Sequence, residues 1–382
     1  MQTPVQDTEP VTSKDRLMLA LHREKPDRLP ASVHQWQAYH LETFMGGATE
    51  LEAFERVGLD AQVQYFESMD QFWVRGAEFG KLNSAVWRDE AQVVNADPDR
   101  RVVHHAITTP SGVLTYKTEG DRKTTWIAEH LIKRDEDIEL IEKYMPVPRL
   151  DVRGVSRAYD AVGDRGILRG FVWGDQAGCW PHAACLHDIK ALILATYDKP
   201  DWVHALLAIL LGKKLEFIRS MKGAKFDLVE TGGGSGSSTL ISPKLHEEFC
   251  LPYDRVIHDA LHDLGFLVTY HTCGGTLGLE ELIVRNGADA SETLAPVSIG
   301  GNQEPWDFKT KIGGRLALIG GLDQWNVLTR GTQAEIRAAV DKLFRTVGDR
   351  GGYICSASDH FFETPAENLV AFADAARECR YG

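Results

Sequence analysis

Apolar positions follow two different patterns along the chain, and the change comes near residue 135. Before that point, a helical stretch that begins at Ser13 is closed by Pro26 and Pro30, and two apolar runs of strand length follow at residues 31–34 and 61–66. After it, apolar runs alternate regularly with segments of helical periodicity. These later runs cover residues 166–171, 226–231, 266–271, 288–293, 316–321 and 352–356.

The eight predicted strands, most of them followed by a helix before the next strand, are typical of one architecture. The chain has 382 residues, which is enough for a large core. We therefore predict an α/β protein of the TIM-barrel, or (β/α)8, class. In such a barrel the active site lies at the carboxyl ends of the strands, here named the mouth.

A different pattern interrupts this alternation early in the chain. Between about residues 73 and 133 the apolar positions form short alternating pieces, and residues 102–108 and 112–117 flank the turn sequence Thr109-Pro110-Ser111. We expect a flexible N-terminal extension at residues 1–12 and a single barrel domain at residues 13–382. An antiparallel β-hairpin region is inserted into that domain at about residues 73–133.

His271, Cys273 and Cys355 form the motif with the clearest chemistry. His271 and Cys273 end the fifth predicted strand two residues apart, so both side chains leave the same face. Cys355 lies at the end of the eighth strand, and the barrel would bring it to the same mouth. One imidazole and two thiolates suit Zn²⁺, and three protein ligands leave a position open for chemistry. The motif predicts a catalytic zinc site, and the alternative is an ordinary buried histidine and cysteine at a strand end.

The fourth position of such a site has several candidates. Glu292 follows the sixth strand and Glu230 ends the fourth, so both would face the mouth. Either carboxylate is a candidate zinc ligand, and so are water and substrate. Each is also a candidate for holding a zinc ligand in place or for contacting the substrate.

Further polar and aromatic residues follow other strands at the mouth. His34 and Trp36 come after the first strand and Trp173 after the third, and we expect them to contact a flat or apolar substrate. The alternative for the two tryptophans is burial in the core. Asp323 follows the seventh strand. His360 follows the eighth and is a candidate either for substrate contact or for packing.

A glycine-rich segment at residues 232–238 follows the fourth strand. It has neither the GxGxxG spacing nor the Gly-Lys-Ser/Thr ending of phosphate-binding loops, so a nucleotide site is disfavoured. A tightly turned loop that covers a substrate or contacts a carrier fits its place at the mouth.

Composition narrows the class of protein further. The formal net charge is −13 and the pI about 5.5, and Lys and Arg are nowhere concentrated, which argues against a nucleic-acid partner. No apolar run reaches the roughly 20 residues of a membrane helix, and the polar first eleven residues resemble no signal peptide. Six cysteines without a CxxC pair are expected to be reduced thiols. We expect a cytoplasmic protein without a membrane partner.

Taken together, seven short motifs in order resemble the uroporphyrinogen decarboxylase superfamily over nearly the whole chain. They are Glu24-Lys25-Pro26-Asp27-Arg28-Leu29-Pro30, Gly170-Phe171, Ser242-Pro243 with Leu251-Pro252-Tyr253, His271-x-Cys273-Gly274, Asn286-Gly287-Ala288-Asp289, Ile319-Gly320-Gly321-Leu322-Asp323 and Thr364-Pro365-x-Glu367-Asn368. The arginine-rich motif and the Phe-Ser-Asp setting of the decarboxylases themselves are missing. The His-x-Cys…Cys pattern and the inserted segment are instead similar to the zinc-dependent corrinoid methyltransferases, including O-demethylase-type members.

This resemblance implies a (β/α)8 barrel and a zinc-dependent methyl transfer. The methyl group would move between a small methoxy or thiol compound and a corrinoid protein or another one-carbon carrier, with the corrinoid supplied by a partner. Glu230, Asp323 and His360 are then candidates for orienting substrate or handling protons, with Glu292 as a substrate contact. The alternatives are a metal-free decarboxylase and a barrel that binds a tetrapyrrole or corrinoid without turnover. The family and general prevalence favour a possible homodimer.

Overall fold

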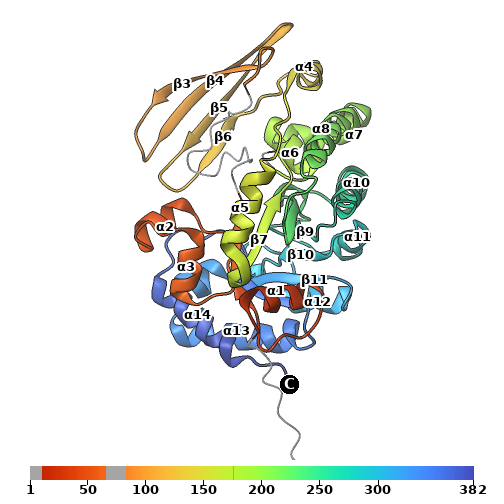
Figure 1. The fold of residues 1–382 in the computed structure, drawn as a ribbon. Helices are drawn as coiled ribbons and strands as arrows, with labels where there is room; N and C mark the ends of the chain where they lie inside the picture. The colour runs from red at the N-terminus through yellow and green to blue at the C-terminus, as the bar shows by residue number, and fades with distance from the viewer. Residues whose placement is uncertain (1–10, 66–82, 175) are drawn as a thin grey trace, which may run out of the picture.

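Eight parallel strands form the central sheet of the computed structural model, which describes residues 11–65, 83–174 and 176–382 (Figure 1). Their spatial order is β1-β12-β11-β10-β9-β8-β7-β2, so each strand after β2 lies beside the barrel strand that precedes it in the chain. The predicted (β/α)8 barrel is confirmed. The strands are β1 (Ala31–Ser32), β2 (Ala61–Gln64), β7 (Gly166–Phe171), β8 (Leu228–Gly232), β9 (Val268–His271), β10 (Ala290–Thr293), β11 (Ala317–Leu322) and β12 (Tyr353–Ala357).

The junction between β1 and β2 is held by separate hydrogen bonds rather than by a strand ladder. The Asp60 amide donates to the Ala31 carbonyl at 2.7 Å, and the Ala31 amide donates back to the Asp60 carboxylate at 3.1 Å. At the other end of β2, the Gln64 side-chain amide donates to the His34 carbonyl at 2.7 Å. These bonds bring the first strand and the residues after it against the rest of the barrel.

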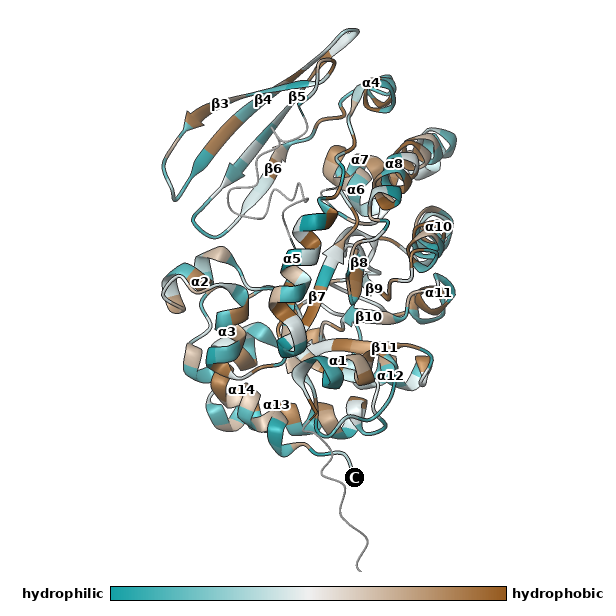
Figure 2. Cartoon of the chain, in the orientation of Figure 1, coloured by the Kyte–Doolittle hydropathy of each residue, from teal (hydrophilic) through white to brown (hydrophobic). Residues whose placement is uncertain are grey.

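Helices cover the outside of the sheet, and both hydrophilic and hydrophobic residues occur along them (Figure 2). Several begin at a residue whose side chain caps the first turn, such as Thr49, Asp188, Ser242 and Thr332. The helices are α1 (Ser13–Leu21), α2 (Ala38–Phe44), α3 (Glu50–Val57), α4 (Asp137–Tyr144), α5 (Val152–Val162), α6 (Cys179–Leu186), α7 (Ile189–Asp198), α8 (Pro200–Ser220), α9 (Pro243–Phe249), α10 (Leu251–His262), α11 (Glu280–Arg285), α12 (Pro305–Ile312), α13 (Gln333–Leu343) and α14 (Ala366–Glu378).

The end of the barrel opposite the mouth is closed by α1. Leu17, Ala20 and Leu21 of this helix pack against apolar residues at the amino ends of several strands, including Ile167 and Ile354. This cluster fills the lower barrel with hydrocarbon. Functional polar groups are therefore confined to the upper barrel and the mouth.

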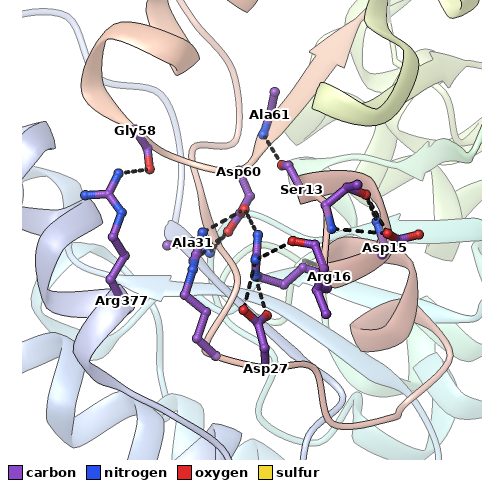
Figure 3. A network of polar contacts seen from close by, with 12 residues as sticks. Ser13, Asp15, Arg16, Asp27, Ala31, Gly58, Asp60, Ala61 and Arg377 are labelled. Carbon is purple, nitrogen blue, oxygen red and sulfur yellow. Dashed lines mark hydrogen bonds and ion pairs between the residues drawn. The ribbon is translucent and has the colours of Figure 1, made fainter. Parts of the chain in front are cut away.

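A buried ionic network fixes α1 in this place (Figure 3). Arg16 donates to Asp27 at 2.7 Å and to Asp60 at 2.8 Å, and Arg28 donates to both oxygens of Asp60 at 3.0 and 3.1 Å. Asp60 is 2% exposed, so its charge depends on these two guanidinium groups. The Glu24-to-Pro30 segment thus joins the helix to the first two strands.

The insertion is a separate antiparallel sheet of four strands in the order β3-β4-β5-β6 (Figure 1). The predicted hairpin corresponds to β4 (Arg101–Thr109) and β5 (Gly112–Gly120), and it is flanked by β3 (Arg88–Asn95) and β6 (Thr125–Glu129). The first part of the predicted insertion, residues 73–82, lies outside the described residues, as do residues 1–10 of the predicted N-terminal extension.

Candidate active site at the barrel mouth

A cavity of about 400 Å³ opens at the mouth of the barrel. Its volume is within the range of about 300–1,000 Å³ that is usual for small-molecule sites. One side of the cavity carries groups able to bind metal or protons, from β8, β9 and the segments after β1, β9 and β12. They are His34, Glu230, His271, Cys273, Asp359 and His360.

Four of the potential ligand atoms converge at the bottom of this side. One atom from each of His34, Glu230, His271 and Glu292 lies within 4.8 Å of the others. The His271 Nδ1 atom is 3.2 Å from Glu292 and 3.3 Å from Glu230. The His34 ring packs on the His271 ring with 4.8 Å between centroids.

Arg169 binds the two glutamates from below. This residue is fully buried in β7, and its Nη2 atom lies 2.8 Å from Glu230 and 2.8 Å from Glu292. Burial raises the pKa of Glu230 to about 8, assisted by the charge of Glu292. Burial also acts against ionisation of Glu292, but Arg169 and the neighbouring histidines outweigh it and hold its pKa well below the usual range. The surroundings therefore favour the ionised form of Glu292 and the protonated form of Glu230.

His271 has a strongly favoured charged form in this setting. Burial alone lowers its pKa, but the neighbouring Cys273, Glu292 and Glu230 outweigh burial and raise the pKa well above its usual value. The groups that stabilise a proton on this imidazole are the same ones that would stabilise another cation beside it.

Asp359 and Cys273 complete the group from the upper side. One atom from each of His34, Asp359 and His360 lies within 4.8 Å of the others. The Cys273 thiol interacts with both the Asp359 carboxylate and the His271 ring, and burial, followed by the Asp359 charge, raises the pKa of the thiol. The His360 Nε2 atom is 3.0 Å from the Gln35 side chain.

Cys355 does not join this group, which corrects the predicted ligand set. Side chains alternate along β12, and Ile354 faces the barrel interior with Ile167 and Ile319. Cys355 therefore faces the helices, where its thiol interacts with the Tyr353 hydroxyl and lies near Cys379. It is fully buried there.

The two tryptophans predicted at the mouth pack in the core instead. Trp36 is 2% exposed and packs edge-on against Phe54 and Phe361, and Trp173 is 2% exposed with its ring against His182. Neither lines the cavity. Their predicted substrate contact is corrected to burial in the core.

Asp323 is the cap of a short helix, η5 (Gln324–Thr329). Its carboxylate accepts hydrogen bonds from the amides of Trp325 at 3.0 Å and Asn326 at 2.7 Å, and from the Ser298 hydroxyl at 2.6 Å. Because these bonds use both oxygens and the residue does not line the cavity, the predicted catalytic role is corrected to helix capping.

Comparison with known proteins places this geometry in a family. The family model described as uroporphyrinogen decarboxylase (URO-D) matches residues 92–379. The chain belongs to the URO-D family. It is 27% identical over 383 residues to the methylcobamide:CoM methyltransferase of Methanosarcina mazei, covering 97% of this chain and 99% of that relative.

Two further matches agree with this assignment. The methylcobamide:CoM methyltransferase of Methanosarcina acetivorans is 25% identical over 182 residues, which cover 47% of this chain and 50% of the relative. The solved structure of a methyltransferase from Methanosarcina mazei superimposes with a TM-score of 0.68 at 16% identity, covering 97% of this chain and 99% of that chain. The structural match supports the barrel fold of this URO-D family member.

The donor set of the mouth fits a divalent metal. The surroundings favour the ionised forms of Glu292 and Asp359. Burial raises the pKa values of the Glu230 carboxyl and the Cys273 thiol, so both groups favour protonated forms whose protons a metal would displace. In the described part of this cluster, Arg169 is the one permanently charged cation. Imidazole, thiolate and carboxylate ligands together are a combination that Zn²⁺ accepts.

Asp359 and Arg169 were not among the residues predicted for the site. Asp359 stands next to the predicted His360, and its place just beyond β12 at the mouth was a usable signal. Arg169 lies in an apolar run, where a single charged residue between Leu168 and Gly170 marks an inward-facing position with buried partners.

The glycine-rich loop reaches the cavity through its tight turn. Gly232, Gly234 and Ser235 line the cavity, and a Cβ atom on Gly234 would lie 2.5 Å from the Cys273 sulfur. The loop is anchored from behind, where Trp180 donates to the Ser235 carbonyl at 3.0 Å. The small residues thus let the backbone approach the thiol closely.

Proposed function

We propose that this URO-D family member is a zinc-dependent methyltransferase that moves a methyl group between a small methoxy or thiol compound and a corrinoid carried by a partner protein. The observation that carries the proposal is the Cys273 thiol, which lines a small-molecule cavity at the barrel mouth and interacts with both the His271 ring and the Asp359 carboxylate. The full-length similarity to a methylcobamide:CoM methyltransferase supports the same reaction class.

In this proposal His271, Cys273 and Asp359 hold the metal, with His34, His360, water or substrate as candidates for the remaining position. Asp359 takes the place that the sequence motif gave to Cys355. A zinc ion bound there supplies Lewis acidity to a thiol sulfur or an ether oxygen of the substrate.

The surrounding residues orient the ligands and handle protons. Glu292 lies beside His271 Nδ1 and accepts its hydrogen, which leaves Nε2 as the nitrogen available to a metal. Arg169 keeps Glu292 ionised, so this orientation persists at neutral pH. Glu230, with its pKa raised to about 8, faces the cavity as a carboxylic acid that can donate or accept a proton near the reacting atom.

The rim of the mouth supports docking of a partner protein. Large apolar side chains stand about half exposed on four successive mouth loops: Leu240 at 52%, Leu277 at 47%, Val297 at 52% and Trp325 at 50%. Exposed apolar side chains on neighbouring mouth loops fit a partner that covers the mouth while it presents its cofactor.

Methyl transfer is tested by following cobalt absorption. Purified protein is incubated with methylcobalamin and candidate thiols, and separately with reduced cobalamin and methoxyaromatic compounds. We expect one pair to change the spectrum, and Glu230→Gln to slow it by about 10²–10⁴-fold. The exposed Glu281→Gln serves as the matched control. Release of carbon dioxide from a carboxylated tetrapyrrole would support the decarboxylase alternative, and no change with any candidate would support a non-catalytic binder.

A further inference from the structure

The cavity at the mouth has two chemically different sides. Beside the metal-binding residues, the rest of its wall comes from α6, α7, the end of β7 and the loop after β8. Phe171, Ala177, Pro181, Ala184, Ile189 and Leu240 form this wall. A substrate whose reacting atom meets His271 and Cys273 must lay the rest of its body against these hydrocarbon groups.

The charges around the cavity disfavour an anionic body. Among the described residues that line it, none is Lys or Arg, and His271, whose charged form is favoured, lies among the metal-binding residues with the carboxyl groups of Glu230 and Asp359. Arg169 lies beneath the cavity and is engaged by Glu230 and Glu292. A sulfonate or carboxylate on the substrate would lose its water against the apolar wall and gain no positive partner there.

One polar atom of the loop that lines the cavity is left unpartnered by the described residues. The Ser235 hydroxyl is buried and has no hydrogen-bond partner among the described residues, although Ser235 lines the cavity. A buried hydroxyl without a partner is costly, so a substrate atom that bonds to it would be favoured. A neutral hydroxyl or carbonyl group provides such an atom without bringing a charge.

We infer that the substrate is uncharged along its body, apolar or aromatic, and carries one neutral hydrogen-bonding group toward Ser235, with Ile189 and Leu240 setting this selectivity. The inference rests on the proposed function for the position of the reacting atom. The inference narrows the proposed substrates, methoxy and thiol compounds, to those with an uncharged and apolar body.

Three methyl ethers that differ at one position test the inference: 4-methoxyphenol, 4-methoxytoluene and 4-methoxybenzenesulfonate. Their binding to the metal-loaded protein is measured by calorimetry and saturation-transfer NMR without corrinoid. We expect the two neutral ethers to bind, the phenol more tightly, and the sulfonate at least tenfold more weakly. Equal binding of the sulfonate, or no binding of the neutral ethers at millimolar concentration, would overturn the inference.

Variants locate the selectivity. Ser235→Ala should remove the advantage of 4-methoxyphenol over 4-methoxytoluene. Ile189→Lys should raise the affinity for the sulfonate, whereas Leu194→Lys on the exposed side of the same helix should leave it unchanged. Thermal melts confirm that each variant is folded.

The binding measurements and the cobalt assay test the two proposals separately. If methyl transfer is absent but the binding order holds, the proposed function falls and the selectivity stands. If methyl transfer proceeds equally well with the sulfonate, the selectivity falls and the proposed function stands.

Discussion

His258 differs from the histidines of the mouth because it lies behind the sheet, on the inner face of α10. Its Nδ1 atom is 2.8 Å from the Asn286 carbonyl and its Nε2 atom is 2.8 Å from the Thr231 hydroxyl. A neutral ring satisfies both contacts. Burial is the main cause that lowers the pKa of His258 to about 4. This residue therefore links folding stability to pH without taking part in the site.

The sign of that link follows from the two pKa values. Above the unfolded value of 6.5, neither state binds a proton, and the stability of the neutral ring is fully present. As the pH falls from 6.5 to about 4, His258 becomes protonated in the unfolded chain but stays neutral in the folded protein, so stability is lost over this window. The full loss for this one group is on the order of 3 kcal/mol.

We predict that His258→Gln flattens the dependence of unfolding free energy on pH between 6.5 and 4. The exposed His22→Gln should leave that dependence as in the wild type. Denaturant melts at several pH values measure both. An unchanged slope in His258→Gln would show that other buried groups control acid stability.

At this scale, part of the site was predictable from the sequence. His271 and Cys273 both line the cavity, as expected for two residues at i and i+2 at the end of a strand. The prediction that Cys355 faces the mouth was wrong by the same alternation rule, because Ile354 is the residue of β12 that faces the barrel interior. The register that decides this parity comes from packing against other strands, which a single sequence does not display.

The loop between β7 and α6 shows how an element supports the cavity. Lys214 of α8 is fully buried and donates to the Trp173 carbonyl at 2.9 Å and the Gln176 carbonyl at 2.7 Å. Gln176 lines the cavity. Between them, Gly174 has φ +129°, and a Cβ atom there would lie 2.7 Å from both His182 Nδ1 and Lys214 Nζ.

Gly174→Ala should therefore destabilise the protein by at least about 2 kcal/mol, because it adds both backbone strain and a steric clash. Gly212→Ala is the matched control, since this glycine lies within α8 with nothing within 4 Å of an added Cβ atom. That change should stabilise by about 0.5–1 kcal/mol. Thermal and chemical unfolding compare the two, and equal effects would contradict the role given to the loop.

Predicted and observed elements agree where pattern and chemistry point the same way. The turn predicted at Thr109-Pro110-Ser111 joins β4 to β5. The insertion was only partly predicted, because β3 is exposed on both faces and lacks the alternation by which strands are recognised. Trp36 and Trp173 could not be separated from mouth residues until the packing of their rings was known.

The whole molecule has one closed end and one open end. The amino ends of the strands are sealed by α1, whereas the carboxyl ends hold the cavity and the apolar rim. The inserted sheet reaches the open end, since Lys123 between β5 and β6 pairs with Glu363 in the loop after β12 at 2.6 Å. No described helix has the length and hydropathy to cross a membrane.

Docking at the rim predicts a defined kinetic effect. Trp325→Ser should raise the KM for a corrinoid-loaded partner protein about tenfold or more, because exposed tryptophans often contribute strongly to interfaces. The KM for free cobalamin should stay the same. Val370→Ser, on α14 away from the rim, is the control. Equal effects on both forms of corrinoid would place Trp325 outside the docking surface.

We propose that a single metal is bound by His271, Cys273 and Asp359 rather than by Cys355. X-ray absorption spectroscopy of the purified protein, combined with metal analysis, tests this ligand set. We predict about one equivalent of zinc with one sulfur ligand near 2.3 Å and nitrogen or oxygen ligands near 2.0–2.1 Å. Cys273→Ser should lose the sulfur signal, Asp359→Asn should weaken binding, and Cys355→Ser should change neither. Two sulfur ligands, or wild-type protein that binds no metal, would rule out this ligand set.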